Sequence, residues 1–118
     1  MKRNIAFYLK DILDSINFIQ QYTANISSED FEKNIQLQDS VVRRLEIIGE
    51  AAKNIPKDFR EKHPSIPWRE IAGLRDVLIH QYFGIKINRI WKVVNSELLQ
   101  LKEKMEKILS EISAEKAE

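Results

Sequence analysis

Hydrophobic residues recur at helical spacing along the first part of the chain. They step alternately by four and three positions, at Ile5, Leu9, Ile12, Ile16 and Ile19, with Tyr8 and Tyr22 beside this stripe. Because a helix completes a turn in about 3.6 residues, this spacing places the stripe on one helical face. The polar stretch 25–28 interrupts the pattern, and the Ser27 hydroxyl is suited to cap a short helical segment after it.

A second long helix is predicted from near Asp39 or Ser40 to Pro56, because proline disfavours a helical conformation in the residue before it. Its apolar residues again step by four and three positions, at Val41, Leu45, Ile48, Ala52 and Ile55. Residues 57–65 then form a polar connector with room for one helical turn around Phe59.

A third helix begins at Pro67, whose fixed φ suits a first helical position. It carries Ile71, Leu74 and Leu78 inward. We expect it to run to about Tyr82, because Gly84 is a natural stop.

The longest hydrophobic stripe belongs to the last predicted helix, which Asn88 can cap. Steps of four and three continue through Ile87, Trp91, Val94, Leu98, Leu101, Met105, Ile108 and Ile112. An average spacing of about 3.5 favours long antiparallel neighbours that cross at a shallow angle. We therefore predict an all-α fold, an antiparallel up-and-down bundle of four to five helices. Residues 1–112 form its single domain and residues 113–118 a frayed tail.

The amino-acid composition excludes several classes of function. The 118 residues allow one conventional core, and 19 Lys and Arg against 18 Asp and Glu leave a net charge of +1. This balance excludes a nucleic-acid coat driven by overall charge but leaves room for a local basic site. Without cysteine the chain has no disulfide, thiolate–zinc or thiol chemistry. No apolar run is long enough to span a membrane, so we expect an intracellular, cytoplasmic protein.

The two histidines have different surroundings. His63 lies in the polar connector and is most simply a solvated loop residue. His80 belongs to the third helix, where about 100° per residue gives its direction. With Ile71 at 0°, Leu74 and Leu78 define a core face near 300° and 340°, and His80 falls at about 180°.

Asp76 and His80 are four residues apart on this helix, so the carboxylate can orient the imidazole and favour its protonated form. Arg75 falls at about 40°, roughly 140° from His80, so a straight helix does not bring the two together. They converge only if the helix end unwinds, if the arginine wraps round, or if a second copy of the chain supplies one group. Otherwise Arg75 forms a salt bridge between helices and His80 is simply exposed.

Other polar residues have weaker claims. Lys86, Arg89 and Lys92 either guide an RNA backbone or form a solvated helix face. For Glu46 and Glu50 we expect surface ion pairing with Arg43 and Lys53, and for Trp68 and Trp91 anchoring roles at a helix start and in the core. The sequence contains no recognisable metal-ligand spacing, glycine-rich phosphate loop or Ser/His/Asp set.

Arg75, four residues, His80, one residue and Tyr82 together resemble the RX4HXY motif of HEPN-domain toxins, the HepT-like ribonucleases encoded beside a minimal nucleotidyltransferase antitoxin. The surroundings resemble the family too, in RLEIIGEAAK at 44–53, IPWREIAGLRD at 66–76 and YFGI at 82–85. The resemblance extends over residues 5–110.

This resemblance implies a HEPN-like fold and a metal-independent endoribonuclease that acts as a homodimer, with a composite cleft between paired motif helices and no cofactor. His80 would exchange a proton with the ribose 2′-hydroxyl or the leaving oxygen, since imidazole titrates near neutrality. Arg75 would bind the scissile phosphate, and Asp76 would position either Arg75 or His80.

Tyr82 corresponds to the family position to which the partner nucleotidyltransferase attaches AMP, which switches the toxin off. An anionic group near Arg75 would occupy the phosphate site and repel RNA. A half-buried tyrosine that closes the bundle is the alternative.

Two other functions stay open. The chain could be a non-catalytic helical module that docks with a nucleotidyltransferase and presents a substrate to it, or a purely structural helical dimer. Dependence of RNA cleavage on Arg75 and His80 separates the toxin from both.

Overall fold

A computed structural model describes the backbone of residues 4–80 and 87–117, and the side chains of these residues except 75–77, 79–80 and 115–117. All regular structure in these ranges is helical, which confirms the predicted all-α class. The long helices are α1 (Ile5–Thr23), α3 (Ile35–Lys53), α5 (Trp68–His80) and α7 (Leu98–Ala117). The short segments are α2 (Ser28–Lys33), α4 (Lys57–Lys62), α6 (Ile87–Lys92) and the π-helical turn η2 (Val93–Glu97).

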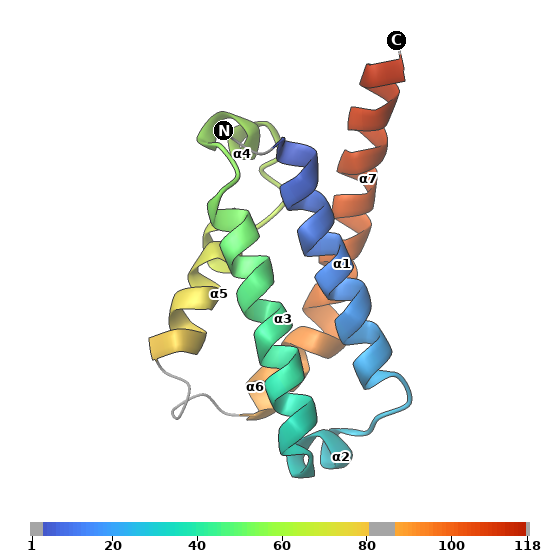
Figure 1. The fold of residues 1–118 in the computed structure, drawn as a ribbon, viewed down its shortest axis with the longest axis vertical. Helices are drawn as coiled ribbons and strands as arrows, with labels where there is room; N and C mark the ends of the chain where they lie inside the picture. The colour runs from blue at the N-terminus through green and yellow to red at the C-terminus, as the bar shows by residue number, and fades with distance from the viewer. Residues whose placement is uncertain (1–3, 81–86, 118) are drawn as a thin grey trace.

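The long helices lie side by side, and the chain reverses direction from each to the next: α1 and α5 descend in the view of Figure 1, whereas α3 and α7 rise. The central helix is α3, which packs against α1 on one side and α5 on the other. On its other side α1 also packs against α7. The helix that carries the predicted motif, α5, therefore rests on α3 at the edge of the molecule (Figure 1).

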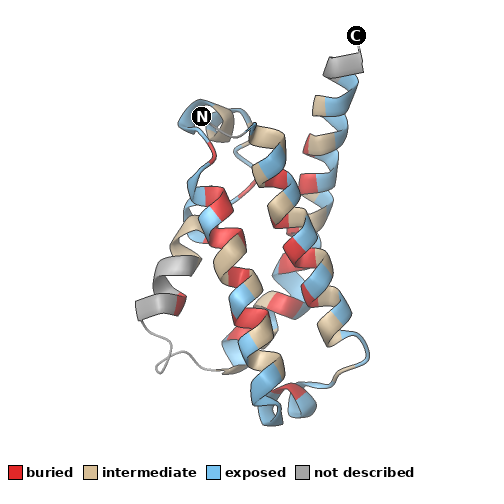
Figure 2. Ribbon diagram, viewed as in Figure 1, coloured by how far each residue is buried: buried red, intermediate tan, exposed pale blue. Residues whose placement is uncertain are grey.

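The core is formed by the predicted apolar stripes. Buried side chains line the inner faces of α1, α3 and α7, as the red bands of Figure 2 show. On α1 the buried stripe consists of Leu9, Ile12, Ile16 and Ile19, and Ile5 is half-buried. None of the described helices has both the length and the hydropathy required to cross a lipid bilayer.

The turn after α1 follows the prediction. Asn25 has a φ of 60°, a left-handed conformation that asparagine tolerates better than most residues, and the helix ends before it. The Ser27 side chain then accepts a hydrogen bond of 3.1 Å from the Asp30 amide, which confirms it as the cap of α2.

The predicted start of the second long helix was wrong by about one turn. α3 begins at Ile35, because the Asn34 side chain caps it by accepting a 3.0 Å hydrogen bond from the Leu37 amide. The first turn is not marked by a buried stripe, since Ile35 is 69% exposed.

The connector before α5 is more ordered than a solvated loop. The helical turn predicted around Phe59 is confirmed as α4. His63, expected in solvent, is instead half-buried, with its ring 4.6 Å from the Phe59 ring. Pro67 precedes the first residue of α5 rather than occupying it, and its carbonyl accepts the Ile71 amide at 3.0 Å.

The last predicted helix is divided by η2, a turn of wider pitch that the regular spacing of apolar residues did not reveal. Figure 1 shows that α6 and α7 run in different directions on either side of it. Such π-turns are a recognised cause of helix bends. Asn88 was wrong as a cap because it lies inside α6, which already includes Ile87. At the other end α7 stays helical to Ala117, through residues expected to fray.

Candidate functional site

The motif helix is fixed at its first turn by a tryptophan. Trp68 is 6% exposed, and its indole Nε1 donates a 3.0 Å hydrogen bond to the His63 carbonyl in the preceding loop. Its ring also meets the Phe59 ring edge-on at 6.4 Å. The predicted role of Trp68 as a helix-start anchor is confirmed.

Further along α5, Ile71 and Leu78 are buried and Leu74 is half-buried, which confirms the core face predicted for this helix. This face packs against α3. The direction of α5 is thus set by hydrophobic contacts that lie two turns apart along the helix.

The structure places Arg75, Asp76 and His80 on α5, all within one uninterrupted helix. Asp76 and His80 are therefore one helical turn apart in the backbone, as predicted. The side chains of these three residues lie outside the described part, and so do Tyr82 and Lys86 altogether. Their proposed contacts and roles stay predictions.

Gly73 lies between the anchored start of α5 and the motif. A Cβ built at this position would meet no atom within 4 Å, leaving out the helix's own backbone. Within the described residues, packing therefore does not require a glycine here, although glycine lowers the stability of a helix interior.

Three cations were predicted to guide RNA, and the structure describes two of them, Arg89 and Lys92. Both are exposed on α6. The opposite side of this helix is anchored, because Ile90 is buried and the Trp91 ring packs 5.0 Å from the Phe31 ring of α2. The anchoring role predicted for Trp91 is thus confirmed, and the arrangement leaves Arg89 and Lys92 free of the hydrophobic core.

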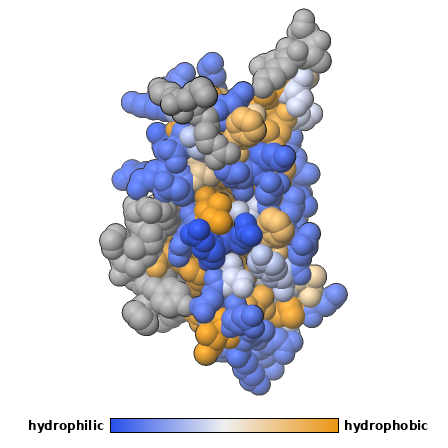
Figure 3. Space-filling model, viewed as in Figure 1, coloured by the Kyte–Doolittle hydropathy of each residue, from blue (hydrophilic) through white to orange (hydrophobic). Residues whose placement is uncertain are grey.

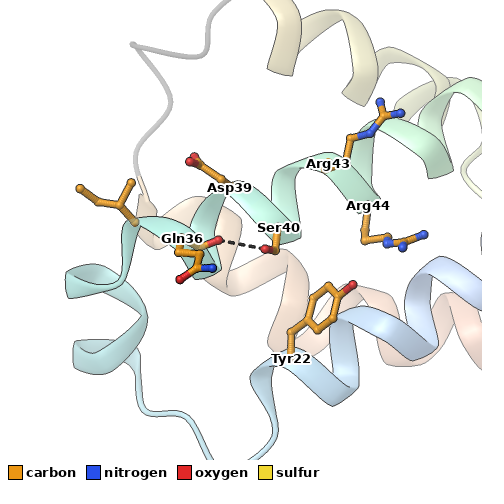
Figure 4. A pocket seen from close by; sticks show the side chains of 7 residues that line it. Tyr22, Gln36, Asp39, Ser40, Arg43 and Arg44 are labelled. Carbon is orange, nitrogen blue, oxygen red and sulfur yellow. Dashed lines mark hydrogen bonds between the residues drawn. The ribbon is translucent and has the colours of Figure 1, made fainter.

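A groove of about 550 Å³ lies between the end of α1 and the first half of α3 (Figure 4). It is lined by Tyr22 of α1 and by Ile35, Gln36, Asp39, Ser40, Arg43 and Arg44 of α3. In Figure 4 the Tyr22 side chain points from α1 toward α3 and the Arg44 side chain points from α3 toward α1, whereas Arg43 points away from α1.

Aromatic and cationic groups are in direct contact at this groove. The Arg44 guanidinium carbon lies 4.3 Å from the centre of the Phe18 ring, a distance typical of a cation–π interaction. The Phe18 ring is also stacked with the Tyr22 ring at 6.2 Å and an interplanar angle of 27°. Figure 3 shows hydrophilic and hydrophobic side chains interspersed on this face of the molecule.

The ion pairing expected for Glu46 is confirmed, since its carboxylate lies 3.5 Å from Arg43. The groove itself was missed by the sequence reasoning, which assigned Arg43 to surface pairing and left Phe18 aside. The available signal was an aromatic pair at positions 18 and 22, one helical turn apart and off the buried stripe of α1.

In the described ranges, no three His, Asp or Glu side chains are grouped so that they could hold a metal ion. The residues described above at the groove and on α6 offer hydrogen-bond donors, cations and aromatic faces. Such groups bind phosphates and bases.

The family model described as "Ribonuclease HepT-like" matches residues 12–108, most of the chain. A relative from Thermococcus cleftensis named "Probable ribonuclease HepT" is 50% identical over 108 residues, which cover 92% of this chain and 98% of that protein. "Putative RNase MJ1216" from Methanocaldococcus jannaschii is 47% identical over 111 residues, 94% of this chain and 92% of that protein.

A longer protein of the same archaeon contains a similar segment. "Gamma-glutamylcyclotransferase and putative RNase MJ0434" is 46% identical over 116 residues, which cover 98% of this chain but only 52% of that protein. The chain therefore spans about half the length of this relative. No solved structure gave a significant match.

Proposed function

The chain belongs to the HepT-like ribonuclease family, and on that basis we propose that it is an RNA-cleaving toxin of a toxin–antitoxin pair. The observation that carries the proposal is the family match over residues 12–108, which includes the whole RX4HXY motif at 75–82. The relatives named as ribonucleases support RNase activity in general. An enzyme that cuts cellular RNA would act in the cytoplasm.

The proposed reaction is attack by the ribose 2′-oxygen on the neighbouring phosphorus. The 2′-hydroxyl loses its proton, the P–O5′ bond breaks and the leaving 5′-oxygen gains a proton. The products are a 2′,3′-cyclic phosphate and a 5′-hydroxyl end. Because the nucleophile is part of the substrate, this route needs no metal-bound water, and DNA cannot follow it.

In this reaction His80 transfers a proton to or from one of the two oxygens, a role for which imidazole is suited in general because it titrates near neutrality. Arg75 binds the scissile phosphate and stabilises the charge that develops on its oxygens. Asp76, one turn before His80 on α5, acts as a positioning residue for the imidazole.

We propose a homodimer as the active unit, because positions 75 and 80 lie about 140° apart around a regular helix. Two copies of α5 facing each other would complete a cleft from both chains. α5 lies at the edge of the molecule, packed on one side against α3, and this placement supports such a pairing. Lys86, Arg89 and Lys92 would guide the RNA backbone toward this cleft.

Regulation is proposed to act at Tyr82, through AMP transfer by a cognate minimal nucleotidyltransferase. The added phosphate would compete with RNA for Arg75 and repel the RNA backbone.

One experiment tests cleavage and regulation together. Purified wild-type protein should cut RNA in the presence of a chelator, and leave DNA and 2′-O-methyl RNA of the same sequence intact. His80→Ala should leave the RNA intact while keeping the circular dichroism spectrum of the wild type. Wild-type protein treated with the transferase and ATP should gain the mass of one AMP and stop cutting, whereas Tyr82→Phe should stay unmodified.

Each arm has a contrary outcome. Cleavage by His80→Ala at the wild-type rate would contradict the assigned proton transfer, and loss of activity in chelator would contradict a metal-free reaction. If folded wild-type protein and His80→Ala leave RNA equally intact, the chain is the non-catalytic module instead. Absence of a mass gain in the wild type removes the regulatory step.

A further inference from the structure

We propose that the groove between α1 and α3 binds a single-stranded segment of the RNA outside the cleavage site. This inference rests on the proposed function for the identity of the nucleic acid as RNA. The groove is lined by Tyr22 and by residues between positions 35 and 44, all far from the motif in sequence. Phe18 lies beside it, in contact with Tyr22 and Arg44.

The aromatic part of the groove provides a surface for bases. Phe18 is 39% exposed and stacks with the half-buried Tyr22, so two neighbouring rings form one apolar face. Bases of any sequence can stack on the part of this surface that the Arg44 side chain does not cover, because every base has a π-surface. If these rings belonged to the hydrophobic core, they would be buried, as the neighbouring Ile16 and Ile19 are.

The cationic part provides partners for phosphates. Arg44 lies over the Phe18 ring, so its guanidinium is held beside the aromatic face while the edge of the group can still donate hydrogen bonds. Arg43 is exposed and pairs with Glu46 at 3.5 Å on the surface, a contact that is weak in water and can exchange for a phosphate.

Apart from the exposed Ile35, the remaining lining is polar, as suits a nucleic-acid strand. The Ser40 hydroxyl donates a 2.9 Å hydrogen bond to the Gln36 carbonyl, which leaves its oxygen able to accept from a base amino group. Asp39 adds one carboxylate against two guanidinium groups, so the net charge of the lining favours an anionic ligand.

The position of the groove fits a strand that also reaches the motif. α3 contributes most of the lining and packs against α5 along its other side. In Figure 4 Arg44 points toward α1 and Arg43 away from it, so the two cations lie across the exposed surface of α3. A strand that leaves α5 can therefore cross α3 to reach the aromatic face.

The test compares a groove variant with a variant of equal charge elsewhere. Arg43→Gln/Arg44→Gln removes both cations of the groove. Lys57→Gln/Lys107→Gln removes two exposed cations, one of which is paired with Glu61 at 3.9 Å much as Arg43 is with Glu46. Binding is measured with 2′-O-methyl RNA of about 20 nucleotides, longer than most single-strand sites and resistant to cleavage.

The groove variant should bind this RNA about tenfold more weakly than wild type, and the slope of log K against log salt should fall by about 1.4, for two lost phosphate contacts. The control variant should change neither quantity by a comparable amount. Tyr22→Leu and Phe18→Leu keep apolar bulk but remove the stacking face, and should weaken binding at every salt concentration. All variants must keep the wild-type melting profile.

Binding by the groove variant that equals binding by the control overturns the proposal. So does an unchanged affinity for RNA together with lost affinity for the nucleotidyltransferase, which would identify a protein-docking surface. The proposed function fails separately: wild-type protein that binds 2′-O-methyl RNA through the groove but cuts no RNA would refute cleavage and leave the groove in place. A tetranucleotide substrate should be cut equally by wild type and groove variant.

Discussion

Gly73 lies inside α5, two residues before Arg75, where a Cβ would meet nothing within 4 Å. Gly73→Ala should therefore stabilise the folded chain by about 0.5–1 kcal/mol, because alanine loses less backbone entropy in a helix. Thermal unfolding should show a melting temperature a few degrees above wild type. Ala72→Gly makes the reverse exchange at the preceding position and should lower the melting temperature.

The RNase activity of Gly73→Ala tests a separate point, namely whether another molecule approaches α5 at this position. Unchanged activity is expected if only this chain surrounds the position. A more stable protein that no longer cuts RNA would show that a second chain or the RNA backbone approaches α5 at Gly73. A lower melting temperature would contradict the helical environment described here.

Single residues were predictable where their partners are close in sequence. Ser27 caps α2 through an amide three residues away, so composition and spacing alone indicated it. Arg44 and Phe18 are separated by 26 positions, and the contact between them depends on how α1 packs on α3. The local pattern offers the aromatic pair at positions 18 and 22 but does not encode the approach of Arg44 to it, which explains why the groove was missed.

Among the elements, α3 shows how capping and tertiary contacts extend a helix beyond its apolar stripe. The first residue of α3, Ile35, precedes the first buried residue of this helix, Val41, by more than one turn. The Gln38 side chain donates hydrogen bonds of 2.8 and 3.0 Å to the Phe31 and Glu32 carbonyls at the end of α2. A start judged from hydrophobic spacing alone was therefore too late.

The cap of α3 makes a measurable contribution. Asn34→Ala should lower the free energy of unfolding by about 1 kcal/mol, because the Leu37 amide loses its 3.0 Å partner. Asn34→Ser should retain most of the stability, since serine caps helices as well. The exposed Asn54 hydrogen-bonds the Glu50 carbonyl at the other end of α3, and Asn54→Ala is the matched control.

Urea denaturation monitored by circular dichroism gives these free energies directly. Equal stability of Asn34→Ala and wild type would mean that the groove end of α3 is held by the contacts of Gln38 and not by its cap. That result would also predict that RNA binding in the groove survives the substitution.

The last helices show the limit of periodicity. Steps of four and three continue through residues 87–112, yet η2 separates α6 from α7. A π-turn adds about one residue per turn, and apolar residues four apart fit either geometry. The bend places α6 against α2 through Trp91 and Phe31, and with it the exposed Arg89 and Lys92.

For the whole molecule, a net charge of +1 means that local groups, and not the overall field, would have to attract the RNA of the proposed function. The described cations that we assign to RNA contacts lie on the exposed side of α6 and in the groove between α1 and α3. The cations of α6 were predicted from the sequence because they follow the motif closely in the chain. Under the proposals made above, both would supply contacts to phosphate that position a strand without selecting its sequence.

The assembly of the active unit is testable with two inactive chains. In a dimer whose clefts each take Arg75 from one chain and His80 from the other, Arg75→Ala and His80→Ala are complementary. A mixed dimer has one cleft that lacks both groups and one that is complete. Unfolded together and refolded in equal amounts, the two variants should recover about a quarter of wild-type activity, because half of the dimers are mixed and each has one intact cleft.

Each variant refolded alone controls for residual activity, and different tags on the two chains allow the mixed dimer to be isolated and counted. A purified mixed dimer without activity would contradict clefts shared in this way. It would require Arg75 and His80 to act from the same chain. The end of α5 would then have to unwind, or the arginine would have to wrap round the helix, since about 140° separates the two positions on a straight helix.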